Sequence, residues 1–292
     1  MYPARFFGLS IPAILAVLSF PASFVWAQGG PPFRSDDPDT PGNKHWEINV
    51  GSIGDRNPAT GSYQVPDLDF NYGVGHRIQL TFEIPVAIQE VRGESNHVLG
   101  GLGNSEFGVK YRFYAHHTEE QKKLPRGERE SNFGFSVYPQ LLLNNPTSSV
   151  DRGVAEKAPQ WILPVQGNCD LGILKISAEV GYLLRTHEES GTWFSGVVVD
   201  HEFQDKIELA VEVYAQHDVF GAPSAPKPRE TTIALGGRLP IAGRESLRFI
   251  WMAGRSLVGV TPANGQPSWI AYAGIQFLIG PKRHSSDYVE PE

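Results

Sequence analysis

The sequence feature that most constrains the fold is an alternation of apolar with polar or small residues that runs from Lys44 to about Gly280. Successive side chains of a β-strand point to opposite faces, so a period of two predicts strands whose two faces meet different surroundings. About twelve such segments follow one another, and no stretch among them has a convincing helical period. The predicted strands are 44–53, 65–74, 77–84, 106–113, 132–143, 160–166, 174–182, 193–202, 206–216, 230–239, 247–255 and 269–279.

The lengths of these strands and of the links between them favour a membrane barrel. Many strands have about ten residues, which is what a tilted strand needs to cross a bilayer, whereas strands of soluble sandwiches are usually nearer five or six. Short links alternate with longer polar ones, as periplasmic turns alternate with outer loops. We therefore expect an all-β fold, a membrane-spanning antiparallel up-and-down β-barrel of about twelve strands over 44–280. A long charged insertion, 116–131, interrupts the rhythm of the links.

The two ends of the chain have a different character from the barrel segment. Residues 1–27 combine Arg5, an apolar stretch and a small-residue cleavage site, which is typical of a signal peptide removed before Gln28. Residues 28–43 are rich in proline, glycine and aspartate and cannot form a central strand. Residues 281–292 form a polar tail. The alternative to a cleaved signal peptide is a retained N-terminal membrane anchor. We expect the mature chain to lie in the bacterial outer membrane.

Composition and charge exclude several other classes of protein. The formal net charge is −7, and a nucleic-acid-binding surface needs clustered positive charge. The single cysteine, Cys169, cannot form an internal disulfide. A secreted soluble β-sheet binding protein remains an alternative, because one dry face and one wet face would produce the same alternation. We predict no cofactor; the expected partners are outer-membrane lipid and a small-molecule solute.

In a barrel with its apolar face toward lipid, the charged face lines the lumen. Buried charges are tolerated only when they are paired or hydrated, and a twelve-strand barrel is wide enough for a narrow hydrated passage. The sequence predicts a passive channel with a lumen of mixed charge; a plugged, purely structural barrel is the alternative. The residues predicted to set its electrostatic selectivity are Asp67, Asp69, Arg77, Glu83, Lys110, Arg112, Glu208, Glu212, Arg238 and Arg248.

Three aspartates near the mature N-terminus, Asp36, Asp37 and Asp39, form a separate cluster. They lack the glycine and distal glutamate of a complete calcium loop, so no metal site is predicted, and aspartates beside prolines often simply form turns. A third hypothesis is that this segment folds into the lumen as a hatch. The side chains expected to meet the aspartates are Arg77, Arg238 or Arg248.

Enzymatic hypotheses have little support in the sequence. A lipid hydrolase on a barrel would need a serine and a histidine at the outward face, and His187 with Ser190, or His201 with Asp200, are the candidate fragments. A nucleophile, a base and an orienting group cannot be assembled from these spacings. We predict that the chain is not an enzyme, and a barrel-borne lipid hydrolase is kept as an alternative.

Several motifs resemble a known family of outer-membrane proteins. They are Pro32–Gly42, Trp46–Asn49, Asp67–Gly73, Arg77–Leu80 and Gly103–Arg112. This pattern is similar to the start and the strands of the transporter family associated with the meta-pathway of phenol degradation. The resemblance implies that small solutes, hydrophobic or aromatic ones among them, pass through the outer membrane of a Gram-negative bacterium.

Overall fold

The computed structural model describes residues 30–92, 97–119, 122, 132–144, 148–186, 190–203, 206–219, 229–257 and 269–281. The predicted signal peptide and most of the predicted C-terminal tail lie outside these ranges. One short helix, α1 (Ser148–Asp151), is described, and no described helix is long and apolar enough to cross a membrane. The strands are β1 (Trp46–Arg56), β2 (Thr60–Val74), β3 (Ile78–Val91), β4 (His97–Leu102), β5 (Asn104–His116), β6 (Phe133–Val137), β7 (Gln140–Asn144), β8 (Gln160–Asp170), β9 (Lys175–Arg185), β10 (Ser190–Glu202), β11 (Glu208–Asp218), β12 (Arg229–Ile241), β13 (Arg244–Ser256) and β14 (Trp269–Ile279).

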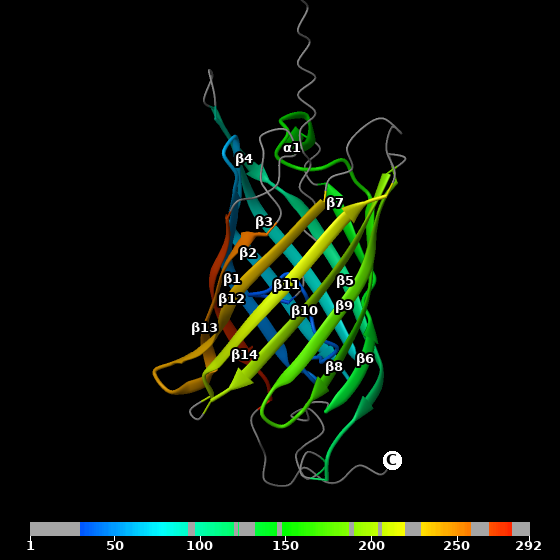
Figure 1. Cartoon of the computed structure of the whole chain (residues 1–292). Coiled ribbons are helices and arrows are strands. Elements are labelled where there is room, and N and C mark those ends of the chain that lie inside the picture. Colours follow the sequence, from blue (N-terminus) through cyan, green and yellow to red (C-terminus); the bar gives the residue numbers. More distant parts are fainter. Residues whose placement is uncertain are drawn as a thin grey trace, which may run out of the picture.

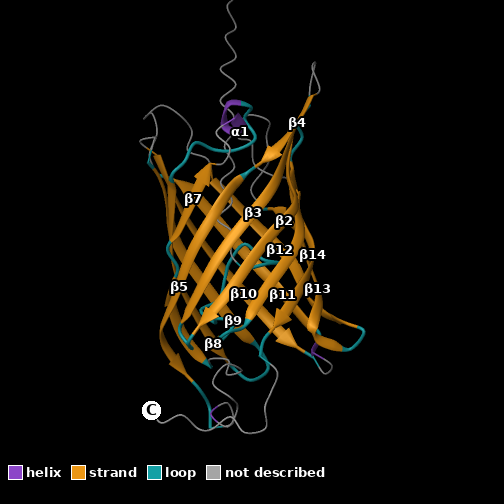
Figure 2. Cartoon of the chain, turned by 180° about the vertical axis from the view of Figure 1, so that it is seen from behind, coloured by secondary structure: helices purple, strands orange, loops and turns teal. Residues whose placement is uncertain are grey.

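The strands form one closed antiparallel barrel (Figures 1 and 2). β1 pairs with β14 along its whole length and β3 pairs with β5, so the sheet closes on itself; β4 pairs with β3 alone. β4 and β5 share one position in the wall, because β4 pairs with the second half of β3 and β5 with the first half. β6 and β7 likewise share the position between β5 and β8. The fourteen described strands therefore make twelve wall positions, which confirms the predicted fold.

One position of the wall is interrupted at Tyr138 and Pro139. Between β6 and β7 the chain passes through Tyr138 and Pro139, and Pro139 has no N–H to donate to a neighbouring strand. The backbone N–H of Tyr138 donates to the carbonyl oxygen of Pro164 in β8 (3.1 Å), and that of Val109 donates to Pro139 (3.0 Å). Proline in a sheet is usually confined to an edge strand or a bulge. Pro164 lies instead within an interior strand, beside the break in its neighbour.

The two ends of the barrel differ in the length of their links (Figure 1). The end that we call the short-turn end carries the links 75–77, 171–174, 203–207 and 242–243, and the start of β1 lies there beside the end of β14. The opposite, long-loop end carries α1 within the link from β7 to β8. The insertion between β5 and β6 remains an exception at the short-turn end, and most of it lies outside the described residues.

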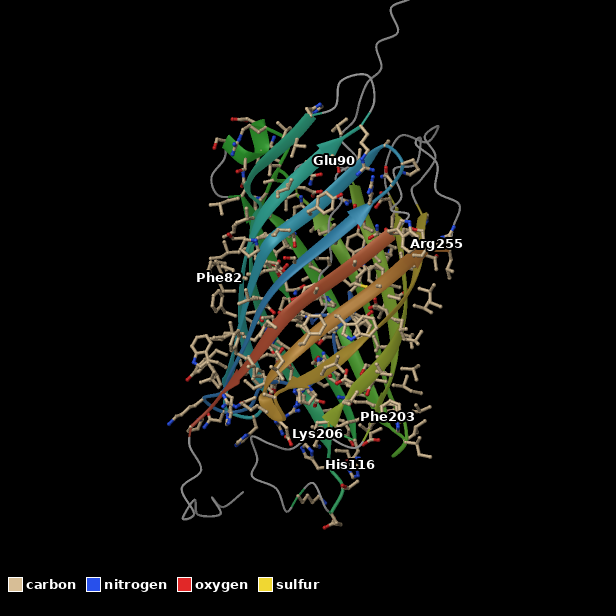
Figure 3. All side chains as sticks on the ribbon, turned by 90° about the vertical axis from the view of Figure 1, so that its left-hand side faces the viewer. Phe82, Glu90, His116, Phe203, Lys206 and Arg255 are labelled. Atoms are coloured by element: carbon tan, nitrogen blue, oxygen red, sulfur yellow. The ribbon has the colours of Figure 1, made fainter. Side chains whose placement is uncertain are left out.

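The outer surface of the wall is apolar. Along β3 and β5 the side chains of Leu80 and Val109 are exposed, while those of Gln79, Thr81 and Lys110 on the alternate positions are buried inside. Figure 3 shows Phe82 projecting outward from the wall, with Glu90 and Arg255 near one end and His116 and Lys206 near the other. An apolar band between two polar ends is the surface that a barrel presents to lipid.

A charge placed in this band should destabilise the barrel according to its depth. Leu235 is 50% exposed at the middle of β12. We expect Leu235→Arg to lower the free energy of unfolding in lipid vesicles by roughly 2–4 kcal/mol, and Ile279→Arg at the short-turn end to lower it by about 0–1 kcal/mol. Urea titrations followed by tryptophan fluorescence measure both. Equal losses at the two positions would contradict a membrane-embedded band.

Candidate functional site in the barrel lumen

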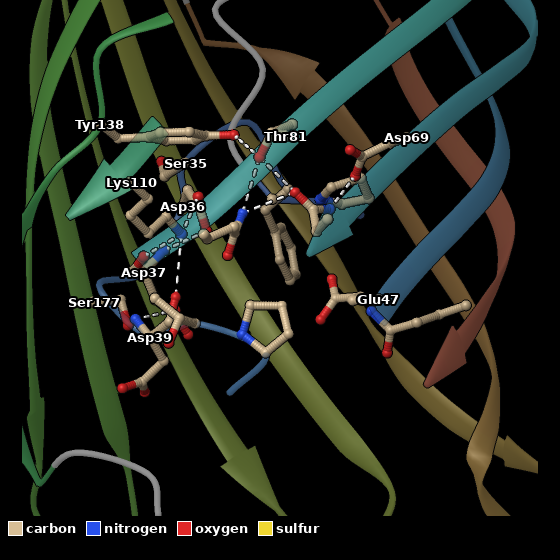
Figure 4. Close-up of a pocket in the computed structure, with 18 of the residues that line it drawn as sticks. Ser35, Asp36, Asp37, Asp39, Glu47, Asp69, Thr81, Lys110, Tyr138 and Ser177 are labelled. Atoms are coloured by element: carbon tan, nitrogen blue, oxygen red, sulfur yellow. Dashed lines mark hydrogen bonds and ion pairs between the residues drawn. The ribbon is translucent and has the colours of Figure 1, made fainter. Parts of the chain in front are cut away.

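The described N-terminal residues 30–43, which we call the strap, lie inside the barrel (Figures 1 and 4). Four of these fourteen residues are prolines, whose missing N–H groups prevent the segment from joining the sheet. Residues 31–35 and Pro38 are buried. Near the end of the strap lies Gly42, whose φ of 89° is readily adopted only by glycine. The chain then joins the wall, where the backbone N–H of Lys44 donates to Gly73 (2.9 Å).

An apolar patch of the lumen receives Phe33 of the strap. The patch comprises inward-facing side chains from β1 and β10 to β14, namely Ile53, Val198, Ala210, Ala234, Ile250, Met252, Ile270 and Tyr272. The sequence predicted a lumen characterised by its charges. The structure shows that one part of the interior is packed with apolar side chains, so the strap is held partly by burial of the Phe33 ring.

Arg34 and Ser35 of the strap bind acidic residues on β11 and β12. Arg34 Nη1 pairs with Glu230 Oε1 (2.9 Å) and Nη2 donates to Gln216 Oε1 (3.3 Å), while its Cζ lies 3.9 Å from the centre of the Tyr214 ring. The Ser35 N–H and hydroxyl both donate to Glu212 Oε1, at 2.7 and 2.8 Å. Glu212, Tyr214, Gln216 and Glu230 are called the acidic site below.

The strap aspartates bind basic residues on β5 and β9. Lys110 Nζ lies 2.5 Å from Asp36 Oδ2, and Arg112 Nη1 lies 2.7 Å from Asp39 Oδ1. Lys175 Nζ lies 3.2 Å from one carboxylate oxygen of Asp37 and 3.2 Å from one of Asp39. Lys110 also donates to the carbonyl oxygens of Asp37 and Asp39, at 2.8 and 3.3 Å. Lys110, Arg112 and Lys175 are called the basic site below; Figure 4 shows Lys110 pointing at the strap.

These surroundings shift the pKa values of two strap carboxyls in opposite directions. For Asp36, burial outweighs the attraction of Lys110 and raises the pKa above its ordinary value. For Asp37, burial acts in the same direction, but the positive charges of Lys175, Lys110 and Arg238 outweigh it and hold the pKa below its ordinary value. Asp37 therefore stays ionised at neutral pH and keeps its attraction to the basic site.

The described hydrogen bonds and ion pairs of the arginines predicted to meet the strap aspartates are with other groups, although Arg238 and Arg248 line the same cavity as these aspartates. Arg77 is exposed in the turn between β2 and β3. Arg248 Nε donates to the carbonyl oxygen of Glu245 (3.0 Å). Arg238 forms an ion pair with Glu208 and donates to the strap through the carbonyl oxygen of Pro31 (3.2 Å). The structure thus replaces the expected arginine partners with the basic site.

Two of the predicted selectivity residues, Asp69 and Glu83, form a row across the wall with Glu106, which was not in the predicted set. Asp69 of β2 lies opposite Glu83 of β3, and Glu83 lies opposite Glu106 of β5. All three are buried, and like charges at directly opposed positions repel each other. Asn49 and Asn71 donate to Asp69 Oδ2, at 2.9 and 2.8 Å. Asp67, two residues before Asp69, faces the same side. We call Asp69, Glu83 and Glu106 the acidic row.

A cavity of about 340 Å³ lies between the strap and the wall (Figure 4). Its lining includes nine carboxylates and four basic side chains, so it is predominantly acidic. Predicted residues from both the wall and the strap meet here. The charged lining residues are Asp36, Asp37, Asp39, Glu47, Asp69, Glu83, Glu106, Asp200, Glu208, Lys110, Lys175, Arg238 and Arg248.

Four residues of the lumen were not identified from the sequence: Arg34, Tyr214, Gln216 and Glu230. The alternation along β11 places Glu212, Tyr214 and Gln216 on one face, so this signal was present. Pairing of that face with Arg34 depends on contacts between residues more than 170 positions apart, which no local pattern reveals.

The fragments considered for a hydrolase are not brought together where the structure describes them. Asp200 lines the lumen cavity, whereas the ring of the next residue, His201, packs against Phe203 at 4.3 Å. His187 and the Ser190 side chain lie outside the described residues. Within the described part of the chain, no group of three or more His, Cys, Asp or Glu side chains is arranged to hold a metal ion.

Comparison with known proteins shows the fold. No protein-family model and no curated protein sequence matches the chain. Among solved structures, the chain is similar to an outer-membrane channel from Pseudomonas putida F1, with a TM-score of 0.64 and 11% sequence identity over 83% of this chain and 98% of that one. It is also similar to the NanC porin, with a TM-score of 0.52 and 7% identity over 79% of this chain and 98% of the porin.

The close approach of the strap to β10 provides a test of its position. A Cβ atom at Gly196 would overlap the Ser35 hydroxyl. We expect Gly196→Ala to displace the strap and to speed its cleavage by endoproteinase Asp-N, measured as loss of the N-terminal peptide by mass spectrometry. Adding Ser35→Gly, which removes the overlapping atoms, should slow cleavage again. Unchanged cleavage in folded Gly196→Ala protein would contradict this packing.

Proposed function

We propose that the chain is an outer-membrane channel for the passive passage of small solutes, and that the strap controls access through its lumen. Three features support the proposal: a closed barrel with an apolar outer band, a charged interior with a cavity, and two similar structures described as outer-membrane channels or porins. Outer-membrane barrels of this kind commonly have polar interiors.

The observation that carries the proposal is the way in which the strap is held. Besides the burial of Phe33 and the stacking of Arg34 on Tyr214, the strap is held mainly by ion pairs and hydrogen bonds to polar and charged wall residues. Buried ion pairs contribute little net stability, because desolvation offsets their attraction. Such a strap can leave when water or a solute takes over its contacts. A plugged structural barrel would more simply be filled with apolar side chains.

Lumen chemistry also bears on the class of solute. The resemblance to the phenol-pathway family adds aromatic molecules to the expected cargo. The cavity beside the strap is lined mainly by charged and polar groups, so the aromatic solutes that pass should carry a polar or charged group. The alternative of a lipid hydrolase gains no support from the described residues, because adjacent strand positions such as Asp200 and His201 point to opposite faces.

Neutralising the strap aspartates tests the channel and the strap together. We expect the triple variant Asp36→Asn, Asp37→Asn and Asp39→Asn to conduct more than the unaltered mature protein in planar bilayers. A loss of only about 1.4 kcal/mol of strap binding raises the strap-free population roughly tenfold. The control is Glu119→Gln, Asp151→Asn and Glu245→Gln, which removes the same charge from exposed positions. Absence of ion current in every variant would favour a plugged barrel.

Charge reversal in the lumen tests its selectivity. In a KCl gradient, Glu83→Lys should shift the reversal potential toward anion selectivity, because it breaks the acidic row. Arg248→Glu should shift it toward cation selectivity, because it adds a carboxylate to the cavity. Asp151→Lys on α1 should leave the potential unchanged. Equal potentials in all these proteins would show that the cavity is not on the permeation path.

A further inference from the structure

The acidic site has the composition and geometry of a receptor for a guanidinium group. We propose that Tyr214, Gln216 and Glu230 form a guanidinium-binding site of the barrel wall, beside Glu212, whose carboxylate binds the strap backbone. Arg34 occupies this site as an internal ligand, and a guanidinium-bearing solute occupies it when the strap leaves. This inference deepens the proposed channel function and rests on it, because it names a class of solute that the lumen recognises.

Hydrogen bonds at the site match the fork of a guanidinium. One terminal nitrogen of Arg34 binds a carboxylate oxygen of Glu230 at 2.9 Å, and the other donates to the amide oxygen of Gln216 at 3.3 Å. Gln216 Nε2 donates to the second Glu230 oxygen at 2.7 Å, which fixes the two acceptors relative to each other. A planar group with two parallel donors satisfies this pair better than an ammonium group does.

An aromatic ring supplies the face on which the guanidinium lies. The Tyr214 ring centre is 3.9 Å from Arg34 Cζ, within the range of a cation–π interaction. Phe194 stacks on Tyr214, with 6.3 Å between ring centres and 20° between ring planes, and holds the ring in place. The Tyr214 hydroxyl is buried without a hydrogen-bond partner among the described residues, so one polar group of the site remains for a ligand.

All four side chains of the acidic site belong to the wall and none belongs to the strap. Glu212, Tyr214 and Gln216 are spaced two apart on β11 and therefore share its inward face. Glu230 of β12 lies directly opposite Gln216 in the strand register. Backbone hydrogen bonds of the closed sheet thus position these four side chains, whichever molecule provides the cation.

With the strap in place, the site is buried and Arg34 supplies the cation beside its carboxylates. Glu212 and Glu230 are only 1% and 4% exposed, and Tyr214 is fully buried. Two carboxylates in such surroundings are costly unless they are paired or hydrated. Departure of Arg34 removes the cation that the structure supplies, and a solute with a guanidinium group restores the contacts to Tyr214, Gln216 and Glu230.

A binding experiment on a vacated site tests this proposal. In the mature Arg34→Ala protein, we expect isothermal titration calorimetry to detect the binding of ethylguanidinium, added as its chloride. Ethylammonium chloride should bind at least about tenfold more weakly at equal ionic strength. Adding Glu230→Gln should weaken ethylguanidinium binding at least about tenfold, since hydrogen bonds to charged groups contribute about 1.5–3 kcal/mol. Tyr214→Leu, which removes the stacking face, should weaken it as well. Folding is checked by circular dichroism and heat-modifiable gel mobility.

A second measurement uses the unaltered protein and detects competition with Arg34. Ethylguanidinium should speed cleavage of the strap by endoproteinase Asp-N more than ethylammonium does, because it competes for the acidic site. Gly196→Ala protein gives the reference rate for a displaced strap.

The results separate this site from the channel function. Folded Arg34→Ala protein that binds neither cation, or that binds both equally, overturns the guanidinium site, and so does binding that Glu230→Gln leaves unchanged. Ion current without ethylguanidinium binding would contradict the site alone. Binding without ion current in any variant would retain the site and contradict the channel.

Discussion

The compensation of charge inside a closed barrel is the constraint on which the rest of the structure depends. Closure pairs the strands around the barrel, and alternation along each strand turns apolar residues outward. The same alternation leaves carboxylates and cations facing a confined lumen. Such groups need partners or water. The strap supplies partners for two sites of opposite charge. This explains why an irregular, proline-rich segment lies inside the regular barrel.

The order of charges along the strap matches the order of sites on the wall. Phe33 enters the apolar patch, Arg34 reaches the acidic site, and Asp36, Asp37 and Asp39 reach the basic site. Each contact is of a kind that a small solute can reproduce: an apolar ring, a guanidinium or a carboxylate. The strap is therefore well suited to exchange with solutes, whereas a covalent or wholly apolar plug is not.

The pattern of strands was predictable because it depends on local periodicity. The last strand was predicted as 269–279 and lies at Trp269–Ile279, and each of the twelve predicted strands overlaps one position of the wall. Two wall positions are each occupied by two consecutive strands, β4 followed by β5 and β6 followed by β7. Periodicity alone did not reveal this division. The break at Tyr138 and Pro139 depends on how neighbouring strands bond across it, and a single strand read in isolation does not contain that information.

What the sequence by itself determined is which side chains face lipid and which face the lumen, since a period of two is a property of the strand backbone. Asp67, Asp69, Glu83, Lys110, Arg112 and Glu212 were all identified as inward-facing in this way, and all are buried. Only the tertiary structure decided their partners. Closure brings strands distant in the chain around one strap, so that Lys110 meets Asp36 and Glu230 meets Arg34. The physical reason is that pairing of charges depends on distance in space, and the barrel sets those distances independently of separation along the chain.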